Sequence, residues 1–132
     1  MERQNISGNS HYEGIVGFSR AVKVGPFVTV GGTVATGDDG KIVGGNDMYA
    51  QAIQTLKNIE RALKAAGATL HDVVRTRMFI TDVGRWQEVA RAHGEYFRDI
   101  RPAATMIQVV AMVSPEMLVE IEADAIIAAE LK

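Results

Sequence analysis

Residues 119–127 read VEIEADAII, and the strict alternation of apolar and acidic residues in this segment is typical of a β-strand with two different faces. The alternation places Glu120, Glu122 and Asp124 on one face and small or aliphatic side chains on the other. Three carboxylates at this spacing repel one another unless a cation lies opposite them. The acidic face is therefore expected to meet a partner strand, a substrate or water.

Length and composition narrow the class of protein. A chain of 132 residues buries about two-thirds of its surface when folded, so we expect residues 1–132 to form a single domain. It has no cysteine, which excludes disulfides, thiolate nucleophiles and cysteine-ligated metals. Its net charge of −2 and the lack of a basic block argue against a nucleic-acid partner. We find no export signal or membrane-spanning segment and expect a cytoplasmic protein.

Strand and helix patterns alternate along the chain. A strand is predicted over residues 16–24, broken at Gly25-Pro26 before a second strand that begins at FVTVGG, which together form a hairpin. A long amphipathic helix follows, capped by Asn46 or Asp47 and ended by Gly67. Residues 72–82 alternate as a third strand.

The C-terminal half continues this order. Thr81 or Asp82 is predicted to cap a second helix over residues 84–97, in which Trp86, His93 and Tyr96 lie on the apolar side. Two strands close the chain, at residues 104–113 and 118–127. The Ser114-Pro115 turn between them favours antiparallel pairing of these two strands.

The predicted order β-β-α-β-α-β-β is that of an α+β fold with a single mixed β-sheet. Two helices for five strands are most simply placed together on one face of the sheet. The open face then carries two arginines of the third strand, Arg75 and Arg77. It also carries the three acids of the last strand, Glu120, Glu122 and Asp124. This face is interpreted as an oligomer interface, and the alternative is a solvated surface with ion pairs worth ~0–1 kcal/mol each.

Three stretches of the chain resemble one protein family. They are LKNIERALKAAGATLHDVVRTRMFITDV at 56–83, RPAATMIQV at 101–109 and EIEADAI at 120–126, and they are similar to the RidA (YjgF, reactive intermediate deaminase) family, formerly called endoribonuclease L-PSP. The resemblance implies a fold like that of Bacillus-type chorismate mutase, in a homotrimer with a small-molecule cleft at each subunit interface. It also implies hydrolysis of enamines and imines released by pyridoxal-phosphate enzymes, with no cofactor in the protein itself.

The resemblance assigns site residues one at a time, and most differ from the family pattern. Active deaminases read P-A-R-[ST] where this chain has Pro102, Ala103, Ala104 and Thr105, so the arginine that binds the substrate carboxylate is replaced by alanine. Four other positions carry residues without the family's polar groups: Phe18 for tyrosine, Gly31 for serine, Ala90 for asparagine and Met106 for cysteine. The family's glutamate, which helps to position water, is matched by Glu120.

A carboxylate substrate would need another cation in such a cleft. Losing one partner of a desolvated charge pair costs ~2–5 kcal/mol. Arg20, expected on the same strand face as Phe18, and Arg101, just before the strand that lacks the arginine, are the candidates; each is otherwise a solvated or interface residue. Without a substitute, the cleft is apolar and suits a less charged ligand.

Two functions are therefore predicted. The first is a divergent enamine or imine deaminase in which Glu120 orients a water. The second is a trimer that binds a small metabolite without catalysis. The three histidines, His11, His71 and His93, lack metal-ligand spacing, so we expect no metal site, and His93 is predicted to pack against the sheet.

Overall fold

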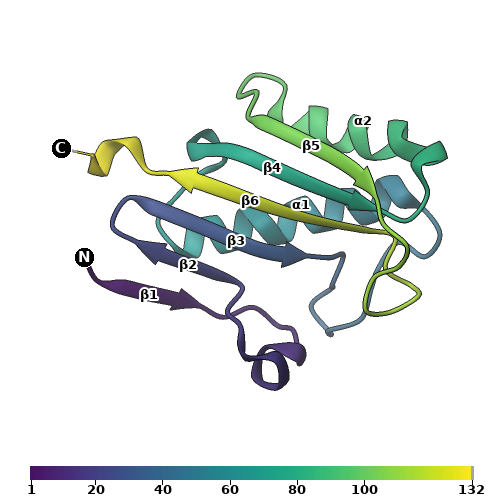
Figure 1. Cartoon of the computed structure of the whole chain (residues 1–132), viewed down its shortest axis with the longest axis horizontal. Coiled ribbons are helices and arrows are strands. Elements are labelled where there is room, and N and C mark those ends of the chain that lie inside the picture. The colour runs from purple at the N-terminus through teal and green to yellow at the C-terminus, as the bar shows by residue number, and fades with distance from the viewer. Residues whose placement is uncertain (132) are drawn as a thin grey trace.

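A computed structural model describes residues 1–131 as one mixed six-stranded sheet with two long helices on one face (Figure 1). The strands are β1 (Arg3–Ile6), β2 (Ala21–Val24), β3 (Phe27–Thr33), β4 (Val73–Ile80), β5 (Ala103–Gln108) and β6 (Val119–Ile126). The long helices are α1 (Met48–Ala65) and α2 (Trp86–Phe97). This confirms the predicted α+β class with a single mixed sheet.

The sheet has the order β1-β2-β3-β6-β4-β5, so the last strand in the sequence lies near its centre (Figure 1). β6 is antiparallel to both β3 and β4, whereas β5 is parallel to β4. The predicted antiparallel pairing of the last two strands is wrong. Helix α2 makes a β-α-β crossover that sets β5 beside β4, and β6 pairs on the opposite side of β4.

The N-terminal part also differs from the prediction. Residues 3–6 form an unpredicted edge strand, β1, and the predicted strand 16–24 begins only at Ala21. A short π-helix, Glu13–Gly17, occupies the preceding segment and ends where Gly17 takes a φ of 86°. Phe18 and Arg20 therefore precede β2 rather than lying within it.

The hydrophobic core lies between β6 and α1. Every second residue of β6, from Val119 to Ala125, is buried, as the alternation predicted. Helix α1 packs a fully buried face against this strand: Met48, Ala52, Leu56, Ile59 and Leu63. The Asp47 carboxylate accepts the Ala50 amide at 3.0 Å, and Gly67 takes a φ of 82° after the helix, so both predicted helix ends are confirmed.

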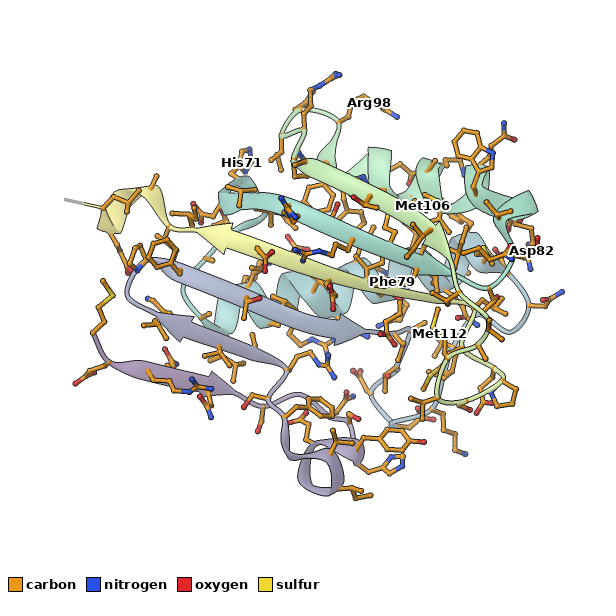
Figure 2. All side chains as sticks on the ribbon, in the orientation of Figure 1. His71, Phe79, Asp82, Arg98, Met106 and Met112 are labelled. Carbon is orange, nitrogen blue, oxygen red and sulfur yellow. The ribbon has the colours of Figure 1, made fainter. Side chains whose placement is uncertain are left out.

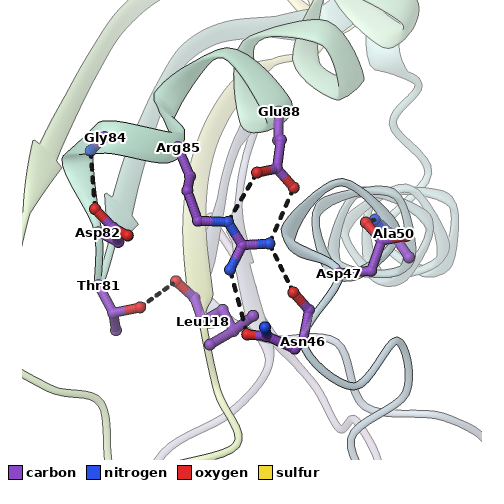
Figure 3. A network of polar contacts seen from close by, with 9 residues as sticks. All are labelled: Asn46, Asp47, Ala50, Thr81, Asp82, Gly84, Arg85, Glu88 and Leu118. Carbon is purple, nitrogen blue, oxygen red and sulfur yellow. Dashed lines mark hydrogen bonds and ion pairs between the residues drawn. The ribbon is translucent and has the colours of Figure 1, made fainter.

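The start of α2 is anchored to the start of α1 by Arg85 (Figure 3). Its guanidinium donates to the main-chain oxygen of Asn46 at 2.6 Å and to both carboxylate oxygens of Glu88 at 2.8 and 3.0 Å. Asp82 accepts the Gly84 amide at 2.9 Å and so caps the short 3₁₀ turn Val83–Arg85 that precedes α2. The two helices are thus held together at the ends where each one begins.

The predicted apolar face of α2 is only partly buried. Tyr96 packs against the core, but the Trp86 side chain is 49% exposed, so a core position for Trp86 is wrong. Trp86 lies beside the edge strand β5, near Met78 and Met106, where the described residues supply no further element to cover it.

His93 packs against the sheet as predicted. Its Nε2 lies 2.8 Å from the hydroxyl of Thr76, which is fully buried on β4. The centre of its ring lies 4.7 Å from that of Phe97, with the two rings tilted by 39°. Burial lowers the pKa of His93 below its ordinary value of 6.5. The folded protein therefore holds this imidazole in its neutral form near pH 7.

We predict that His93 makes the protein less stable in acid. The unfolded state takes up the proton first, so the stabilisation is complete above about pH 6.5 and is lost as the pH falls towards the lower folded pKa. Because the ring is only partly buried, we expect a small loss of stability and not complete unfolding. Urea unfolding of the wild type and of His93→Gln at pH 5 and pH 7.5 measures this loss of unfolding free energy.

The glutamine variant should lose less stability on acidification than the wild type. The matched control is His71→Gln, because His71 is exposed and its replacement should leave the difference between the two pH values unchanged. Equal pH dependence in wild type and His93→Gln would contradict this account.

Candidate functional site

A β-bulge in β3 shapes the candidate site. Val30 pairs with Ala123 and Thr33 with Ile121, so β3 has one residue more than β6 over this interval. The two β3 residues that lie between these pairs, opposite the single residue Glu122, are Gly31 and Gly32. The Gly31 amide donates to the main-chain oxygen of Arg20 at 2.9 Å. Bulges of this kind redirect side chains and often lie next to functional sites.

The carboxylate of Glu120 lies against this bulge. A Cβ at Gly32 would collide with Oε2 of Glu120, so the glycine leaves the space that the carboxylate occupies. Glu120 is partly buried, and desolvation, followed by the negative charge of Glu122, raises its pKa above the ordinary range, while Arg20 acts in the opposite direction. A carboxyl with a pKa raised in this way is a candidate for proton transfer in a reaction.

Arg20 is the basic residue whose charge acts on Glu120. Its Nη1 donates to the main-chain oxygen of Gly32 and to the Thr33 hydroxyl at 3.2 Å, and its Cζ lies 5.2 Å from the ring centre of Phe18. Burial lowers the pKa of Arg20, against the charges of Glu13 and Glu120. Within residues 1–131, no carboxylate oxygen lies within 4.0 Å of this guanidinium.

The other two acids of β6 are paired across the sheet. Arg77 on β4 lies 3.5 Å from the Glu122 carboxylate and 3.2 Å from that of Asp124, which also accepts the Thr29 hydroxyl at 2.6 Å. Opposite charges on neighbouring strands therefore do pair on the open face. Glu120 is different, because its partner in register on β4 is Phe79.

A groove of about 460 Å³ lies beside Glu120. Its acidic residues are Glu120 and Glu122, and the others are apolar: Phe79, Val109, Ala111, Met112 and Val113. Figure 2 labels two of them, Phe79 on β4 and Met112 in the segment after β5. The sequence did not indicate the apolar residues of this groove, because residues 109–113 were predicted to continue the strand that begins at 104. In the structure β5 ends at Gln108, and the residues after it form a loop.

The remaining predicted residues lie elsewhere in the chain. Ala104, Thr105 and Met106 are on the edge strand β5 and line a second groove, of about 370 Å³, with Trp86 and Ala90 of α2. Ala104 and Met106 pair in register with the buried Thr76 and Met78, which places them on the helix-covered face. Arg101, exposed and with a φ of 59°, precedes this strand.

The predicted site residues therefore form two separate groups. Phe18, Arg20, Gly31 and Glu120 lie together around the β3 bulge. The β5 residues are separated from them by β4, and two of them lie on the other face of the sheet. A single chain does not bring the two groups into one cleft. The predicted placement of Phe18 and Arg20 on one strand face is corrected to a loop in which the guanidinium lies over the ring.

Residues 1–131 contain neither of two other kinds of feature, a cluster of metal ligands and a membrane-spanning helix. No three histidine or acidic side chains in this range are grouped closely enough to hold a metal ion. None of the helices there combines the length and the apolar character needed to cross a membrane.

Comparison with known proteins places the chain in a family. Residues 9–127 match the family described as Endoribonuclease L-PSP. The chain belongs to this family, which is also known as the YjgF or RidA family. A RutC family protein of Pyrococcus abyssi is 33% identical over 82% of this chain and 84% of its own length.

Solved structures of this family share the fold. A Mycobacterium tuberculosis member of the YjgF/YER057c/UK114 family is 48% identical, with a TM-score of 0.85 over 95% of this chain and 99% of that one. The Yersinia pestis protein YyfA, of unknown function and of the conserved Rid family, is 31% identical, with a TM-score of 0.84 over 95% and 99% of the two chains. The predicted family is thus confirmed.

We predict that Gly32→Ala moves the Glu120 carboxylate without unfolding the protein. The new methyl group would overlap the far end of a flexible side chain, which can rotate away at small cost. Once displaced from the bulge, the carboxyl should be better hydrated, so its pKa should fall towards the ordinary range. A carbon-13 NMR titration of the glutamate carboxyls measures this shift.

Gly31→Ala is the matched control. The atoms nearest to a Cβ at Gly31 belong to Arg20 and Ser19, at 3.7–3.8 Å, which is ordinary van der Waals contact, so the Glu120 titration should not change. An unaltered Glu120 pKa in Gly32→Ala would show that the bulge does not set the position of the carboxylate.

Proposed function

We propose that this chain hydrolyses the imine or enamine form of a small metabolite, at clefts between three copies of itself. The single observation that carries the proposal is the Glu120 carboxylate, partly buried, with a raised pKa, and located between the Arg20 guanidinium and an apolar groove. Membership of the RidA family supports the same reaction class. A cytoplasmic location stays a prediction.

The reaction needs a group that both gives and accepts a proton. Protonated Glu120 would donate its proton to the β-carbon of an enamine, converting it to the iminium cation. The resulting carboxylate would take a proton from water while the water oxygen bonds to the iminium carbon, giving a carbinolamine. Glu120 would then pass this proton to the amine nitrogen, and the C–N bond would break as the hydroxyl proton returns to the carboxylate, giving a carbonyl compound and ammonia. A raised pKa makes the protonated form of Glu120 more available than that of an ordinary glutamate.

Assembly of several chains would complete the cleft. The β5 edge strand has no partner on its outer side among the described residues, and Trp86 and Ile107 near this edge are 49% and 47% exposed. Uncovered strand edges and apolar side chains commonly mark contacts between chains. In a trimer, the Ala104 and Met106 group of one copy would face the Glu120 group of the next.

A second candidate function is binding without catalysis. Ala104 has only a methyl group where the family resemblance predicts an arginine, and Phe18 and Gly31 likewise have no hydrogen-bonding side chain. These residues favour a trimer that holds a small metabolite and does not transform it.

We expect the wild-type protein to accelerate the decay of enamines formed in situ from threonine by a dehydratase. Glu120→Gln should reduce this acceleration by about 100-fold or more, because the amide can neither accept nor supply the proton. Absorbance of the enamine against time gives the rate. Asp124→Asn is the matched control, since Asp124 lies on the same face of β6 but is paired with Arg77 and Thr29.

The two functions predict different outcomes. No acceleration by the wild type, with activity gained in Ala104→Arg, would reject the enzyme and favour the binding protein. Light scattering provides a separate test of assembly. A mass close to that of a single 14.3 kDa chain would contradict the proposed cleft.

A further inference from the structure

We infer that Arg20 binds the substrate carboxylate, on the β3 side of Glu120, in place of the arginine that position 104 lacks. This inference rests on the proposed function and assigns a specificity-determining residue to it. It also predicts the direction in which the substrate lies across the sheet.

The charge of Arg20 is incompletely balanced in the structure. The side chain is partly buried and makes no direct ion pair with residues 1–131, although Glu13 and Glu120 act on it at longer range. Arg77, on the same sheet, has two acids within 3.5 Å. Taking a cation out of water without a direct partner is unfavourable, so an anionic ligand would stabilise Arg20 where it lies.

The guanidinium is also held ready for a ligand. Only Nη1 makes hydrogen bonds with residues 1–131, to the oxygens of Gly32 and Thr33, and the Phe18 ring supports the guanidinium at 5.2 Å. The other two nitrogens have no partner in that range. No buried side-chain nitrogen there lacks a hydrogen bond, so these two nitrogens must reach the solvent. An arginine fixed in this way loses little entropy when its free N–H groups bind a carboxylate.

The charges around Arg20 favour a monoanion. Glu13 and Glu120 are near enough to affect the pKa of Arg20, and Glu122 is near enough to affect that of Glu120. These acids repel a phosphate dianion more strongly than a carboxylate, which carries a single charge. The ligand is therefore assigned as a carboxylate.

Within a single chain, the other candidate cation, Arg101, is placed less well. Arg101 comes just before β5, whose first residue, Ala103, pairs with Arg75 of β4. Glu120 pairs with Phe79, four residues further along β4, so Arg101 lies towards the other end of that strand. Arg101 is also exposed, so it has no buried charge for a ligand to balance.

The assignment orients the substrate across three strands. Glu120 on β6 lies between the β3 bulge, where Arg20 is held, and Phe79 on β4. With its carboxylate on Arg20, a substrate would place its reacting carbon over Glu120 and its side chain in the groove of Phe79 and Met112. The apolar residues of that groove fit an apolar side chain.

Binding of a product-like acid tests the assignment directly. The probe is 4-methyl-2-oxopentanoate, compared by calorimetry with the neutral ketone 4-methyl-2-pentanone and with inorganic phosphate. We expect Arg20→Gln to weaken binding of the oxo acid by about 10-fold or more and to leave the neutral ketone unchanged. Arg20→Lys, which keeps the charge, should retain part of the affinity.

The control variant is Arg101→Gln, which should bind the oxo acid like the wild type. Circular dichroism and thermal unfolding establish that each variant is folded. Equal weakening of acid and neutral ketone in Arg20→Gln would mean that Arg20 only supports the bulge, and would overturn the inference. Phosphate binding as tight as that of the oxo acid would overturn the carboxylate assignment.

Kinetics separate the failure of this inference from that of the proposed function. If the wild type hydrolyses imines but Arg20→Gln does not raise KM for carboxylate-bearing imines above that for neutral ones, the Arg20 assignment is wrong and the activity stands. If the wild type hydrolyses no imine but binds the oxo acid through Arg20, the activity is wrong and the Arg20 assignment stands.

Discussion

The burial of one face of β6 organises the whole molecule. Val119, Ile121, Ala123 and Ala125 are buried against the helices, and each larger aliphatic side chain contributes about 1.5–3 kcal/mol when removed from water. A one-residue slip of β6 would turn three acids into this core, so its register with β3 and β4 is strongly determined. The same register sets the open face, because it decides which group on the neighbouring strands lies opposite each acid.

The three acids of β6 have different surroundings for this reason. Glu122 and Asp124 share Arg77, whereas Glu120 lies between a ring and a bulged backbone with no cation in direct contact. Two of the acids thus form ion pairs with Arg77 across the sheet. The third, Glu120, has a raised pKa that suits it to proton transfer. The residue opposite each acid therefore decides whether its carboxylate forms an ion pair or stays free for chemistry.

Much of the fold could be predicted because it depends on local patterns. The alternation of 119–127, the amphipathic face of α1 and its capping by Asp47 are properties of a few neighbouring residues. The pairing of β5 with β4, the short edge strand β1 and the exposure of Trp86 depend on where distant segments meet. The antiparallel pairing predicted from the Ser114-Pro115 turn was wrong for this reason, since two strands joined by a turn need not pair with each other.

By itself the sequence determined the family, the two helices, the strand that carries the acids and the absence of an arginine at position 104, because these follow from residue identity and spacing along the chain. Only the tertiary structure decided that Arg20 and Glu120 lie at one bulge, that Phe79 faces Glu120, and that Ala104 and Met106 lie on the other face of the sheet. These relations arise from long-range register, which is set by the packing of the whole core and cannot be read from any short stretch of residues.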